Sequence, residues 1–134
     1  SGFAAALIER ALQLAVKPTY ERLRLLCEAV AREAERDPSC AGAAAHHLLA
    51  DTRPLLQVID ALLDHQDPLH SGSHDAVAAQ ALVCQVAYGR ATDDWKLSQE
   101  LLALALEVAE GPAVCARLRE NLAIVAANLG ASLG

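Results

Sequence analysis

Apolar residues recur at intervals of three and four along most of the chain. The segment YERLRLLCEAVAREAERD shows the pattern clearly, with apolar positions at Tyr20, Leu23, Leu26, Cys27, Val30 and Ala34. This spacing places the apolar side chains on one face of an amphipathic α-helix, with the charged residues on the other. The pattern therefore predicts a bundle of packed helices.

Prolines and polar turns divide the first half of the pattern. A first helix is expected from Phe3 to Val16, ending near Lys17-Pro18, because the residue before a proline is disfavoured in the α conformation. A second helix follows at once and stops at Asp37-Pro38. The next apolar segment, up to residue 65, is either one helix kinked at Pro54 or two short helices that meet there.

The stretch QDPLHSGSHD, residues 66–75, concentrates proline, glycine, serine and aspartate and is predicted to be a loop. Three helices are expected after it, beginning near residues 73–75, 93–94 and 112. Residues 1–134 are thus predicted to form one all-α domain of six or seven helices, with an N-terminal half (3–65), a loop (66–75) and a C-terminal half (76–129).

Composition supports this class of fold. Hydrophobic residues make up 54% of the chain but aromatic residues only 3%, and alanine and leucine dominate, as in closely packed helices. No apolar run reaches the roughly 18 residues that a membrane span needs, and the first residues lack the basic start of a signal peptide. We expect no membrane partner and a cytoplasmic location. Because the sequence contains no methionine, we also expect the chain to be part of a larger protein.

The formal net charge is −6, and no basic stripe follows any predicted helix. We therefore expect no nucleic-acid partner, because binding nucleic acid requires cationic side chains that neutralise phosphates. The acidic surface also has no heptad seam, so we expect a monomer or a weak dimer. The four cysteines form no CxxC pair and are expected to be free thiols in a reducing compartment.

Residues 77–129 resemble tetratricopeptide-repeat helical hairpins in degenerate form. In that family, the first helix ends on an aromatic residue, a tight polar turn follows, and the second helix opens with Asp plus an aromatic residue. The matching residues here are Tyr88, the turn 91–94 and Trp95, followed by Ser98, Leu102 and Ala105 at the family's small, large and alanine positions. Gln85 stands where the family has a glycine. The chain is also similar, more weakly, to helical regions that accompany J-domains in some bacterial co-chaperone-like proteins.

The resemblance implies a non-catalytic module for protein–protein interaction or regulation, whose partner is another protein or another domain of the parent chain. Repeats that grip a carboxylate place basic and amide side chains on the concave face of the first helix, but these positions here are Ala79, Leu82, Val83 and Val86. Such an apolar face is covered either by helices of the N-terminal half or by a partner's amphipathic helix.

The candidate binding residues lie around the polar turn and are Tyr88, Arg90, Trp95 and Lys96. For Trp95 itself we favour a packing role between the two hairpin helices, with ligand contact as the alternative.

Five histidines fall within residues 46–74. His47 with Asp51, and His70 with His74 if the following helix begins early, have the i, i+4 spacing by which one helix offers two ligands to a metal. We favour solvated helix ends and loop, and hence no metal and no cofactor. A helical domain with a central small-molecule or metal-binding pocket is the alternative function. No GxSxG or phosphate-binding glycine motif is present, so no catalytic residue is proposed and the domain is not expected to be an enzyme.

Overall fold

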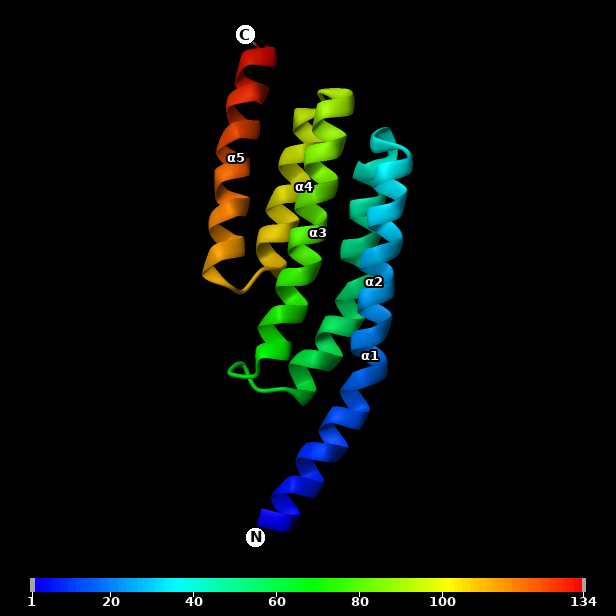
Figure 1. Ribbon diagram of the computed structural model, residues 1–134. Coiled ribbons are helices and arrows are strands. Elements are labelled where there is room, and N and C mark those ends of the chain that lie inside the picture. The colour runs from blue at the N-terminus through cyan, green and yellow to red at the C-terminus, as the bar shows by residue number, and fades with distance from the viewer. Residues whose placement is uncertain (1, 134) are drawn as a thin grey trace.

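The computed structural model describes residues 2–133, which form α-helices, a single 3₁₀ turn and no strand. The elements are α1 (Gly2–Arg36), η1 (Pro38–Cys40), α2 (Ala41–Leu62), α3 (Pro68–Thr92), α4 (Trp95–Val108) and α5 (Pro112–Leu133), shown in Figure 1. The all-α prediction is confirmed. The predicted count of six or seven helices is not, since the described residues form five α-helices.

Two prolines lie inside helices, Pro18 where a helix end was expected and Pro54 where either one kinked helix or two short helices were expected. The expected end of a helix near Pro18 is wrong, because α1 runs through it without a break, and α2 likewise continues through Pro54. A proline inside a helix removes one backbone hydrogen bond and costs about 3 kcal/mol. Val16 and Leu23, on either side of Pro18, are both buried, so tertiary packing of the flanking turns offsets this local cost.

The helices stack so that each packs against the next helix in the chain and also against the one after that. Thus α3 contacts α1 and α5 as well as its neighbours α2 and α4. One core cluster joins α1, α2 and α3 and includes Leu101 of α4, and a second joins α3, α4 and α5, so α3 lies at the centre of the molecule. The first turns of α1 project beyond the other helices (Figure 1), and their side chains are almost all exposed.

The predicted loop 66–75 is wrong over most of its length, because α3 already begins at Pro68. Asp67 caps this helix by accepting a hydrogen bond from the Leu69 backbone N–H at 2.9 Å, and Pro68 occupies the first turn, where its missing N–H has no cost. The same Asp-Pro signal that suggests a loop therefore starts a helix. As a result, His70 and His74 lie one turn apart on α3.

The turn between α4 and α5 is tied to α3 by Asp75. Its carboxylate accepts hydrogen bonds from the backbone N–H groups of Glu110 (2.9 Å) and Gly111 (3.0 Å). This contact holds the C-terminal end of α4 beside the first turns of α3. It thereby brings Val108 and Glu110 next to the two histidines.

None of the described helices is long and apolar enough to cross a membrane.

Candidate functional site

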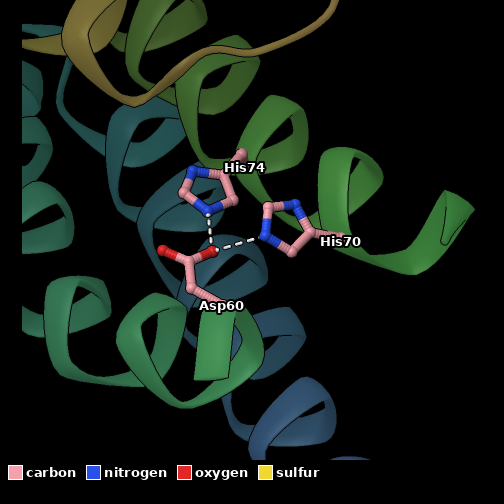
Figure 2. A group of neighbouring side chains, drawn as sticks. All are labelled: Asp60, His70 and His74. Carbon is pink, nitrogen blue, oxygen red and sulfur yellow. Dashed lines mark hydrogen bonds and ion pairs between the residues drawn. The ribbon is translucent and has the colours of Figure 1, made fainter. Parts of the chain in front are cut away.

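Asp60 of α2 and the two histidines of α3 converge on one point (Figure 2). The Oδ1 atom of Asp60 lies 2.6 Å from His74 Nε2 and 3.0 Å from His70 Nε2. The i, i+4 spacing stacks the two imidazole rings with their centroids 5.3 Å apart. One carboxylate oxygen and two ring nitrogens thus face each other between α2 and α3.

The other nitrogen of each ring is held by an acceptor at the end of α4. His74 Nδ1 lies 2.9 Å from the backbone carbonyl oxygen of Val108, and His70 Nδ1 lies 2.9 Å from Glu110 Oε1. A carbonyl oxygen can only accept, so His74 donates from Nδ1, and an ionised Glu110 requires the same of His70. In their neutral forms, both rings therefore present an unprotonated Nε2 to Asp60.

The two histidines differ in their surroundings. His70 is 1% exposed, and its Nε2 makes no hydrogen bond to any described residue, although Asp60 is close. His74 is partly exposed. Burial alone would lower the pKa of His74, but its hydrogen bonds to Asp60 and to the Val108 carbonyl, together with the nearby charges of Asp60 and Glu110, raise the pKa above its usual value.

A small cavity adjoins this cluster. It has a volume of about 330 Å³, and its lining includes Asp60 and His74 together with Arg53, Gln57 and Glu107. A second possible ligand group shares His70 with Glu110 and the exposed His65. Imidazole and carboxylate groups in such sets are suited to binding a divalent transition-metal ion.

The favoured interpretation of the histidines as solvated helix ends and loop is wrong for His70 and His74. The side chains of His46, His47 and His65 are exposed. Sequence reasoning missed Asp60 and Glu110, which are distant from the histidines along the chain. The Asp67-Pro68 cap was the available signal for His70 and His74, because a helix that begins at Pro68 gives them their i, i+4 spacing.

The candidate binding residues at the α3–α4 turn differ in their surroundings. The Tyr88 hydroxyl donates to Asp94 Oδ2 at 2.7 Å, and its ring packs on Gly42 of α2. Trp95 is half-buried and packs against Gly89 and the second core cluster, in line with a packing role. Arg90 and Lys96 are exposed.

A groove runs between α3 and α5 and includes Arg90. It has a volume of about 490 Å³ and is lined by Leu82, Val83, Val86, Ala87, Arg90, Arg117 and Asn121. Val83 is 55% exposed, so the helices of the N-terminal half do not cover its side chain, whereas Leu82 beside it is buried in the second core cluster. No acidic residue belongs to the lining, and neither arginine forms an ion pair within residues 2–133.

Comparison of the chain with protein-family models, with curated proteins and with solved structures found no match.

Proposed function

We propose that this domain is a non-catalytic helical module that binds an acidic, amphipathic segment of a partner protein in the α3–α5 groove. The observation that carries this proposal is that Arg90 and Arg117 both line one open groove. The rest of the surface is dominated by acidic groups, since the chain has a formal net charge of −6. Two unpaired cations at one place are therefore complementary to carboxylates from outside the molecule.

The apolar residues of the groove also favour an amphipathic partner. Val83 is exposed and Val86 is half-buried, so a docked segment would remove apolar surface from water. An amphipathic helix presents apolar residues at helical spacing to such a groove and keeps its charged residues at the rim. The tetratricopeptide-like hairpin that we propose for α3 and α4 is compatible with this mode of binding, because α3 supplies one wall.

The proposed setting is the cytoplasm. Cys27, Cys40, Cys84 and Cys115 are all free thiols. Burial raises the pKa of Cys27 to about 11, with a smaller contribution from Cys84. A protonated, buried thiol is chemically inert and behaves as a small apolar side chain.

The experiment uses a display library of random peptides selected on the whole chain, followed by fluorescence anisotropy with the selected peptide carrying fluorescein. We expect the selected peptides to combine Asp or Glu with Leu or Ile at helical spacing. Arg90→Glu and Arg117→Glu should each weaken binding by about tenfold or more, which corresponds to ~1.4 kcal/mol per charge contact.

Arg119→Glu is the matched control, because Arg119 is an exposed arginine of the same helix that does not line the groove. It makes the same change in net charge and should leave the affinity within about twofold. Selection of basic peptides, or equal losses for Arg117→Glu and Arg119→Glu, would overturn the proposal.

A further inference from the structure

We propose that Asp60, His70 and His74 form a binding site for a divalent transition-metal ion, with zinc as the best fit. Two imidazoles and one carboxylate match the nitrogen and oxygen ligands that this ion takes. The site lies at the opposite end of α3 from the arginine groove. The two proposals therefore rest on different residues.

The first argument is the direction of the lone pairs. The Val108 carbonyl and the Glu110 carboxylate fix the protons of the two rings on Nδ1. In their neutral forms, the two imidazoles then direct their Nε2 lone pairs at the same oxygen of Asp60, which is itself electron-rich. Three lone pairs at one point repel one another unless a cation, either a proton on His74 or a metal ion, lies between them.

The second argument is that the Nε2 atom of His70 has no hydrogen-bond partner within the described part of the chain. His70 is 1% exposed, and this nitrogen is buried. Burying a polar atom without a hydrogen-bond partner destabilises the folded state, so another interaction must offset this cost. A metal ion at the point shared with Asp60 would supply one.

The third argument is that a hydrogen-bond acceptor orients each of the two histidine rings. Metal-binding histidines usually donate their second ring N–H to a backbone carbonyl or a carboxylate, which orients the ring. His74 and His70 each have one such acceptor, at 2.9 Å in both cases. The acceptors come from the end of α4, which Asp75 ties to α3. The rings are therefore oriented before any ion binds.

The distances are compatible with an ion after a small adjustment. Ligands at ~2.0–2.2 Å from zinc in tetrahedral geometry are about 3.3 Å from one another. The Asp60 oxygen lies 2.6 and 3.0 Å from the two nitrogens, so these distances must lengthen by about 0.7 and 0.3 Å. Asp60 is exposed and can move in this way. Three protein ligands leave at least one position for water, and Asp60 and His74 border the cavity of about 330 Å³.

The test is titration of the chelator-treated full chain with Co²⁺, followed by its visible absorption, and with Zn²⁺ by calorimetry. We expect one ion per chain, a cobalt spectrum typical of four or five ligands, and a melting temperature that rises by several degrees with Zn²⁺ and falls again with EDTA. Asp60→Asn and His74→Ala should each weaken binding at least tenfold, by analogy with the ~10–100-fold effects of supporting residues.

Two controls keep the test specific. His46→Ala removes an exposed histidine outside the cluster, and His65→Ala removes a member of the alternative group with His70 and Glu110. Both variants should bind Zn²⁺ as the unchanged protein does. Unaltered binding in Asp60→Asn and His74→Ala, loss in His65→Ala alone, or no binding at micromolar Zn²⁺ would each overturn the assignment. The last result would mean that a proton on His74, paired with Asp60, provides the only cation.

Discussion

Gly89 and Gly72 lie in the same helix, but their surroundings are opposite. A Cβ atom on Gly89 would lie 2.8 Å from Trp95 Cζ3 and 3.3 Å from Ser98 Oγ, whereas one on Gly72 would meet nothing within 4 Å. The rigid indole ring cannot give way without moving the α3–α4 contact. Gly89 therefore permits Trp95 to pack closely, and Gly72 has no such role.

We predict that Gly89→Ala lowers the free energy of unfolding by about 1–3 kcal/mol, because the strain of overpacking exceeds the gain in helix propensity. Gly72→Ala should raise it by about 0.5–1 kcal/mol, since alanine is favoured in an exposed helix interior. Urea unfolding followed by circular dichroism measures both values. Equal effects of the two variants would show that Trp95 does not pack against Gly89 in solution.

At the scale of the element, the beginning of α4 depends on Asp94. Its carboxylate accepts hydrogen bonds from the Leu97 backbone N–H at 3.1 Å and from the Tyr88 hydroxyl at 2.7 Å. The preceding Asp93 adopts a left-handed conformation with φ of 56°. The Asp94 hydrogen bonds, that from Tyr88 first and that from Leu97 second, lower the pKa of this carboxyl below its usual value.

We predict that Asp94→Ala costs about 1 kcal/mol of stability at neutral pH, a typical value for loss of a helix N-cap. A lowered folded-state pKa stabilises the protein above the unfolded-state pKa of ~3.9, and this contribution is lost as the pH falls through the folded value. The difference between the variant and the unchanged protein should thus shrink below about pH 4. Thermal unfolding across this range measures it.

Asp93→Asn is the control for this effect, because asparagine tolerates the left-handed conformation and Asp93 is not the capping residue. It should be nearly as stable as the unchanged protein at neutral pH. A larger loss for Asp93→Asn than for Asp94→Ala would contradict the assignment of the cap.

At the scale of the whole molecule, α1 has apolar residues on two opposite faces. Val16, Leu23 and Val30 are buried, while a second stripe of Phe3, Leu7, Leu14 and Leu25 is exposed. Leu7 and Val16 are nine residues apart, which is two and a half helical turns and places them on opposite sides.

This exposed stripe can pair with the same stripe of a second copy, but a single helix face buries much less than the ~1,600 Å² of a standard interface. We therefore predict a monomer that dimerises weakly, with a Kd above about 10 µM. Leu14→Asp should abolish dimerisation in sedimentation equilibrium, and Val58→Asp, at an exposed position of α2, should not. A tight dimer, or one insensitive to Leu14→Asp, would contradict this prediction.

Local patterns in the sequence were sufficient for the class of fold and for the beginnings of α4 and α5, but not for the beginning of α3. Apolar periodicity and an Ala- and Leu-rich composition predict an all-α bundle, and α4 begins at Trp95 directly after the Asp94 cap, within the predicted limits. These features depend on residues within one or two turns of each other, so they can be read from neighbouring positions.

Tertiary packing decided the features that local patterns predicted wrongly or did not predict. Burial of Val16 and Leu23 keeps α1 helical through Pro18, against the local preference of the proline. The candidate metal site joins Asp60 to His74 across 14 positions, and His74 to the Val108 carbonyl across 34. The arginine groove likewise joins Arg90 of α3 to Arg117 of α5. Such contacts arise only when separate helices stack, because their geometry depends on the packing of whole helix faces and not on the spacing of residues within one helix.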